Sequence, residues 1–136
     1  MIKGWTTNPD NAFLPAEISE AKWYTEPVTW EVRNDIPEEA GLYIYSAKLK
    51  FPQNDLFNSM RTVMYAGKAS VSIQQRYTDH WREHLFDQCR KAYKGNFQFH
   101  YMKIVNQEML DNIKDYEQKL INVYGPSINQ IASVKQ

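Results

Sequence analysis

Apolar and polar residues follow the spacing of β-strands in four short segments of the chain. The segments are residues 28–33, 42–45, 62–66 and 97–101. The second is entered through a turn at residues 37–41, and it is rich in β-branched and aromatic side chains, which favour strands. The third is predicted to end at Gly67, since glycine accepts a positive φ.

Two longer segments repeat their apolar residues at the spacing of amphipathic helices. The first is predicted to be capped by Ser70 or Ser72 and to end near residue 93. Its predicted buried stripe consists of Tyr77, Trp81, Leu85 and Cys89. The second runs from about residue 107 to 124 and ends at Gly125-Pro126, a strong C-terminal signal.

This order of elements predicts a small α+β domain. An antiparallel β-sheet of about three to four strands would be flanked by helices. Residues 1–35 are predicted to be an N-terminal arm with an edge strand, and residues 36–136 to be the domain itself.

Composition limits the classes of function. The 16 basic and 16 acidic residues give zero net charge, so we expect no general coating of nucleic acid, although a local basic patch can still hold phosphates. With one cysteine, Cys89, no internal disulfide is possible. No apolar run reaches membrane-spanning length, and the N-terminus lacks an apolar signal segment. We therefore expect a soluble protein of the cytoplasm with no membrane partner.

Glu117 is the most informative polar residue of the second helix. It falls on the apolar face, four residues after Ile113 and three before Leu120. A carboxylate there is costly unless it is paired or holds a cation. The alternative is a glutamate at the edge of the stripe that reaches water or an arginine.

Arg76 and His80 lie one turn apart on the first helix. Arginine offers a planar fork suited to phosphate, and histidine exchanges a proton near neutral pH. The alternative is an ordinary solvated helix face. Tyr43 and Tyr65, on adjacent strands, could bring their hydroxyls together, or could simply pack in the core. His84 and His100 are interpreted as surface or edge residues.

The chain contains, in this order, Gly41-Leu42-Tyr43, Tyr65-Ala66-Gly67-Lys68, Arg76, His80, Glu117 and Asn129. This ordered set of motifs resembles the GIY-YIG nuclease superfamily. It spans about residues 36–131. Leu42 and Ala66 stand where the family has its eponymous isoleucines, and the segment between Tyr43 and Tyr65 is longer than the family's compact hairpin.

The resemblance implies a metal-dependent endonuclease that hydrolyses phosphodiester bonds in DNA. It implies catalytic roles for Tyr43, Tyr65, Lys68, Arg76, His80 and Glu117. Glu117 would hold Mg²⁺ or Mn²⁺, and Lys68, Arg76 and Asn129 would contact the substrate, with Asn129 also orienting the loop after the last helix. The general base stays open among Tyr43, Lys68 and His80. Two alternatives also stay open: a catalytically retired fold that binds DNA or protein, and an unrelated α+β protein in which Glu117 and Arg76 form a structural ion pair.

Overall fold

The computed structural model describes residues 14–48, 61–126, 128 and 129. It confirms the predicted class: an α+β fold with an antiparallel sheet flanked by helices. The elements in chain order are α1 (Ala16–Ser19), β1 (Tyr24–Pro27), η2 (Glu31–Asp35), β2 (Gly41–Lys48), β3 (Arg61–Ala69), α3 (Ile73–Arg82), α4 (Asp87–Ala92), β4 (Phe97–Lys103), α5 (Gln107–Asp111) and α6 (Ile113–Tyr124).

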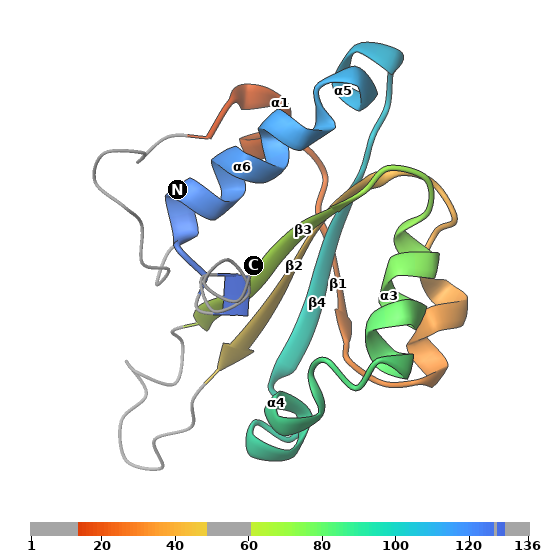
Figure 1. Ribbon diagram of the computed structural model, residues 1–136, viewed down its shortest axis with the longest axis vertical. Helices are drawn as coiled ribbons and strands as arrows, with labels where there is room; N and C mark the ends of the chain where they lie inside the picture. The colour runs from red at the N-terminus through yellow and green to blue at the C-terminus, as the bar shows by residue number, and fades with distance from the viewer. Residues whose placement is uncertain (1–13, 49–60, 127, 130–136) are drawn as a thin grey trace.

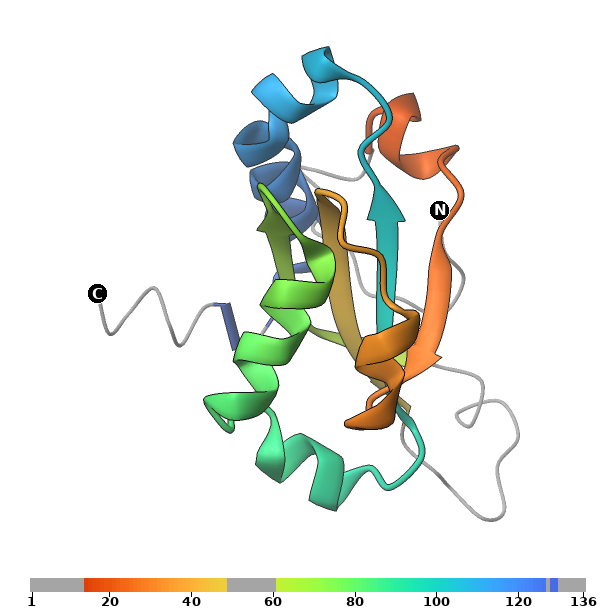
Figure 2. The same cartoon turned by 90° about the vertical axis from the view of Figure 1, so that its right-hand side faces the viewer.

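The sheet has the strand order β1-β4-β2-β3, and each pair of neighbours is antiparallel. Its outer strands are therefore β1 and β3. Figure 1 shows α3 on one side of the sheet and α6 on the other, and the quarter turn in Figure 2 brings α3 and η2 side by side. Part of the predicted N-terminal arm thus belongs to the sheet, because β1 pairs with β4 along its whole length.

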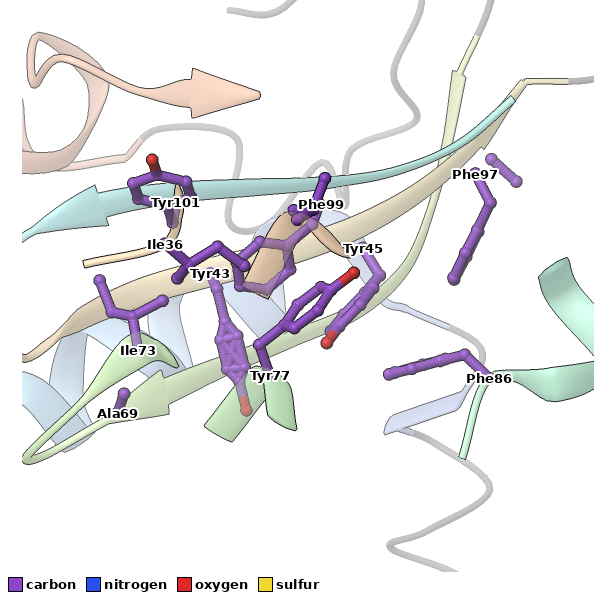
Figure 3. Packing of buried hydrophobic residues seen from close by; sticks show 12 residues of the cluster. Ile36, Tyr43, Tyr45, Ala69, Ile73, Tyr77, Phe86, Phe97, Phe99 and Tyr101 are labelled. Atoms are coloured by element: carbon purple, nitrogen blue, oxygen red, sulfur yellow. The ribbon is translucent and has the colours of Figure 1, made fainter. Parts of the chain in front are cut away.

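Aromatic rings fill the face of the sheet that α3 covers. Tyr43 and Tyr45 are two residues apart on β2, so both project to this face, where Tyr77 and Phe86 meet them (Figure 3). Tyr45 and Tyr77 are stacked with ring centroids 6.4 Å apart. The Tyr77 hydroxyl donates to the carbonyl of Thr29 at 2.6 Å, which ties α3 to the segment before η2.

Aliphatic side chains dominate the opposite face, under α6. Leu42 and Ile44 alternate with the tyrosines on β2, and they pack with Ile113 and Leu120 of α6. Because β2 is buried on both faces, all but the last of its residues are inaccessible to solvent.

The N-terminus of α3 is fixed by three hydrogen bonds. The Ile73 amide donates to the carbonyl of Glu39 at 2.8 Å, and the Gln74 amide donates to the carbonyl of Pro37 at 3.0 Å. The Ser72 hydroxyl accepts from the Gln75 amide at 3.1 Å and is the N-cap. These donors would otherwise lack partners at a helix start. They orient α3 against the turn that leads into β2.

The predicted strand at residues 28–33 was wrong. Glu31–Asp35 forms the 3-10 helix η2, and the outer strand is Tyr24–Pro27, immediately before it. The Tyr24 ring stacks on Tyr101 of β4 with centroids 5.3 Å apart, an interstrand contact that the local pattern does not reveal.

The long helix predicted to end near residue 93 is in fact two helices. α3 ends at Arg82, and His84 has a φ of 59° before α4 begins at Asp87. Leu85 lies in this turn and is exposed, so its predicted place in the buried stripe was wrong. The turn brings Phe86 into the aromatic core instead. The final helix is likewise divided at Asn112, although its predicted end at Gly125, with a φ of 51°, is confirmed.

His100 was wrongly expected at the surface. Its Nε2 lies 2.7 Å from the Ser46 hydroxyl and its Nδ1 lies 2.8 Å from the Thr25 hydroxyl, so its ring joins three strands. The pairing of β1 with β4 creates this site. Residues 49–60 of the long segment between Tyr43 and Tyr65, and the beginning of the predicted arm, lie outside the described residues. Among the described helices, none is long and apolar enough to cross a membrane.

Candidate active site

An open cleft of about 720 Å³ lies between the helices that flank the two faces of the sheet, next to the C-terminal end of β3. Its walls come from α3, α6, the end of β3 and the segment that precedes β2. The lining residues are Glu38, Lys68, Ser70, Val71, Ser72, Gln74, Gln75, Arg76 and Glu117. Three of the predicted site residues, Lys68, Arg76 and Glu117, thus share one cleft.

Strand register brings the two predicted tyrosines to the same face. Tyr45 pairs with Tyr65, and Tyr43 pairs with Gly67. A β-bulge follows the Tyr45–Tyr65 pair, because Ser46 pairs with Val63 and leaves Met64 as an extra residue. The rings of Tyr43 and Tyr65 lie with centroids 6.2 Å apart, and their hydroxyls are within hydrogen-bonding range.

Gly67 was predicted to end the strand by adopting a positive φ, and this prediction was wrong. β3 continues through Gly67 to Ala69, and Gly67 is not among the residues with positive φ. A Cβ at this position would lie 2.5 Å from the hydroxyl oxygen of Tyr43 and 2.5 Å from its Cζ. The glycine is required because the Tyr43 ring lies across its backbone.

His80 is enclosed by aromatic rings and is only 3% exposed. Its ring centroid lies 5.5 Å from that of Tyr43 and 5.7 Å from those of Tyr45, Tyr65 and Phe86. Burial, and then the charge of Arg76, lower the pKa of His80 to about 4. The imidazole is therefore neutral at neutral pH.

Arg76 extends from the exposed side of α3 to the Tyr43 hydroxyl, with which it forms a side-chain hydrogen bond. Tyr43 itself is fully buried. Burial raises the pKa of Tyr43 and the neighbouring Tyr65 raises it further, whereas Arg76 opposes the rise. Tyr43 is thus a protonated phenol whose oxygen already faces a fixed cation.

Glu117 lines the cleft at the edge of the apolar stripe of α6 and is half-buried. Within the described part of the chain it has no hydrogen bond and no ion pair, so the alternative of a structural ion pair with Arg76 receives no support. Its charge nevertheless acts on the hydroxyls of both Tyr43 and Tyr65.

The two remaining predicted site residues are Lys68 and Asn129. Lys68 lines the cleft and donates to the Ser70 hydroxyl at 3.4 Å. The carboxamide of Asn129 accepts from the Ala66 amide at 2.8 Å and donates to the Ala66 carbonyl at 2.9 Å. Asn129 therefore attaches the segment after α6 to β3, directly beside Tyr65, which fits the expected orienting role.

Sequence reasoning missed Tyr45. Its hydroxyl lies 3.1 Å from Nδ1 of His80, while the Tyr43 hydroxyl lies 3.5 Å from Nε2 of the same ring. Tyr43 and Tyr45 are two residues apart on one strand and share a face, but this spacing does not distinguish a tyrosine that only packs from one that bonds to a histidine.

No family model, curated protein or solved structure matches the chain.

Proposed function

We propose that this protein is a metal-dependent endonuclease of the GIY-YIG type that hydrolyses phosphodiester bonds in DNA. The observation that carries the proposal is the convergence of Tyr43, Arg76 and Glu117. These residues come from β2, α3 and α6, and the charges of Arg76 and Glu117 both act on the Tyr43 hydroxyl. A cation and an anion that line one open cleft, with a buried phenol hydrogen-bonded to the cation, suit the hydrolysis of a charged ester.

Arg76 is the group best placed to bind the scissile phosphate. It lines the cleft, and its guanidinium offers two parallel donors to phosphate oxygens. Lys68 lines the same cleft and adds a second positive charge. Because the chain has zero net charge, we expect attraction to DNA to come from this local pair rather than from the whole surface.

Tyr43 would orient or deprotonate the attacking water, but only after Arg76 moves. Its hydroxyl is buried and hydrogen-bonded to the guanidinium. A phosphate that draws Arg76 toward the cleft would uncover the phenol. Since burial raises the pKa of Tyr43, a positive charge must remain near its oxygen if it is to act as a base. Of the other two candidates, His80 is buried, whereas Lys68 lines the cleft.

The donor set of the cleft fits a divalent cation. Glu117 offers a carboxylate without an ion pair among the described residues, and Mg²⁺ commonly binds through one or two carboxylates together with substrate phosphates and water. No cluster of three acidic, histidine or cysteine ligands exists in the described part of the chain. Mg²⁺ or Mn²⁺ held by Glu117 would supply charge neutralisation at the phosphate.

The test is a plasmid-nicking assay with Mg²⁺ or Mn²⁺ on the full chain and on Glu117→Gln. The substitution keeps the size of the side chain and removes the negative charge, so we expect cleavage to fall by at least about a hundredfold with the melting temperature unchanged. Glu108→Gln is the matched control, because Glu108 is an exposed glutamate on α5 that does not line the cleft. It should cleave like the wild type.

Cleavage by Glu117→Gln at the wild-type rate would disprove the assignment of Glu117. A wild-type chain that binds DNA but cuts it with neither cation would identify the protein as a retired fold that acts as a binding module.

A further inference from the structure

Both nitrogens of the His80 ring face a tyrosine hydroxyl. Nδ1 lies 3.1 Å from the Tyr45 oxygen and Nε2 lies 3.5 Å from the Tyr43 oxygen. A neutral imidazole carries one N–H and one lone pair, so it donates to one tyrosine and accepts from the other. The two possible tautomers therefore give Tyr43 opposite roles.

The Tyr45 hydroxyl decides between them. Tyr45 is 1% exposed, and within the described part of the chain His80 is its one hydrogen-bond partner. If Nδ1 carried the proton, Tyr45 would accept it and its own hydroxyl proton would be buried without an acceptor, which is unfavourable. If Nδ1 carries the lone pair, the Tyr45 O–H donates to it, and the proton of the ring is on Nε2.

The contacts of the Tyr43 hydroxyl are consistent with a ring proton on Nε2 of His80. The Tyr43 oxygen receives the Arg76 guanidinium and then also the Nε2–H of His80. Its own proton can point to the Tyr65 oxygen, which is within hydrogen-bonding range. The protons of Tyr45, His80 and Tyr43 then each have an acceptor, and the series ends at the half-buried Tyr65.

We propose that Tyr45 is a positioning residue that holds His80 in the Nε2–H tautomer, so that the ring donates a hydrogen bond to the Tyr43 oxygen. In this form His80 does not accept the Tyr43 proton. Its Nε2–H stabilises negative charge on the phenol oxygen once Arg76 has moved to the phosphate. The tautomer follows from the contacts alone, while its effect on cleavage rests on the proposed nuclease function.

The experiment reads the tautomer directly by long-range ¹H–¹⁵N NMR of the full chain labelled with ¹⁵N-histidine. The chain has three histidines, and spectra of His84→Gln and His100→Gln assign the signals by elimination. We expect His80 in the wild type to show a protonated Nε2 and an unprotonated Nδ1. In Tyr45→Phe the donor to Nδ1 is gone, so we expect the Nδ1 signal to shift downfield to the position of an unprotonated ring nitrogen without a hydrogen bond.

Tyr77→Phe is the matched control. Tyr77 stacks against Tyr45 in the same core, but its hydroxyl donates to the Thr29 carbonyl rather than to His80. This variant loses the same atom from a neighbouring ring and should keep the wild-type Nδ1 signal. If the protein cleaves DNA, turnover should fall about tenfold in Tyr45→Phe, with KM little changed and Tyr77→Phe at the wild-type rate.

A protonated Nδ1 in the wild type, or an Nδ1 signal that Tyr45→Phe leaves unchanged, would overturn the proposal. If Tyr45→Phe does not fold, the wild-type spectrum alone tests the proposal. A protonated Nε2 of His80 supports it, and a protonated Nδ1 contradicts it. The NMR result also stands when no cleavage is detected, so failure of the nuclease function and failure of the tautomer assignment are distinguishable.

Discussion

The ring of Tyr43 lies against the backbone of Gly67 in the candidate site. The ring of Tyr43 occupies the space that a Cβ on Gly67 would need. We predict that Gly67→Ala displaces the Tyr43 ring, lowers the free energy of unfolding by about 1–3 kcal/mol and reduces cleavage at least about tenfold. Urea unfolding and the nicking assay measure the two effects.

Gly95→Ala separates loss of stability from loss of the site. Gly95 has a φ of 72° and no heavy atom within 4 Å of a Cβ built on it, so alanine there introduces backbone strain remote from Tyr43. It should destabilise the protein without slowing cleavage. Cleavage by Gly67→Ala at the wild-type rate would show that the position of the Tyr43 ring is not important for activity.

Among the elements, α3 has the most direct influence on the site because it carries both Arg76 and His80. Its first turn is held by the Ser72 cap. We predict that Ser72→Ala lowers the free energy of unfolding by about 1 kcal/mol, while Ser72→Asp, which retains a capping oxygen, restores most of it. Ser70→Ala is the control, because the Ser70 hydroxyl accepts from Lys68 and does not cap the helix. Equal losses in the two alanine variants would contradict the role of the cap.

The same elements show what local patterns could predict. Alternation identified the cores of β2, β3 and β4, and glycine with proline marked the end of α6. The break after α3 has no such signal, because His84 adopts a positive φ without being a glycine. Although the choice of site residues rests on the resemblance to the nuclease family, the placement of Arg76 and His80 on one helix and of Tyr43 and Tyr65 on adjacent strands was predictable. Tyr45 was not, because a buried tyrosine that only packs and one that donates to a histidine have the same sequence pattern.

For the whole molecule, the buried His80 and the half-buried His100 predict how stability changes with pH. Burial first, and then a neighbouring arginine, lower the pKa of both His80 and His100 to about 4; the arginines are Arg76 and Arg61. In the unfolded chain the value is about 6.5. Below that pH the unfolded chain binds protons that the folded protein accepts only near pH 4. Stability should therefore be complete above about pH 6.5 and fall as the pH drops toward 4.

We expect each histidine to contribute a loss on the order of 2 kcal/mol across this range. Urea unfolding between pH 7 and pH 4.5 measures the total. His100→Gln keeps a polar side chain between Ser46 and Thr25 but cannot take up a proton. Its stability should depend less steeply on pH than that of the wild type. An identical dependence would contradict the contribution of His100.

The contact between Asn129 and β3 affects how copies of this protein can associate. β3 is an outer strand, and outer strands offer free amides and carbonyls to which a strand of another chain can add. At Ala66 both groups are already bonded to the Asn129 carboxamide, which imitates a neighbouring strand at one residue. The side chain thus blocks pairing of another strand with β3 at this residue, which disfavours edge-to-edge aggregation there. The cleft begins at Lys68, two residues farther along the same strand. A strand added here would lie next to the cleft, so the contact that attaches Asn129 to β3 also disfavours strand addition beside the site.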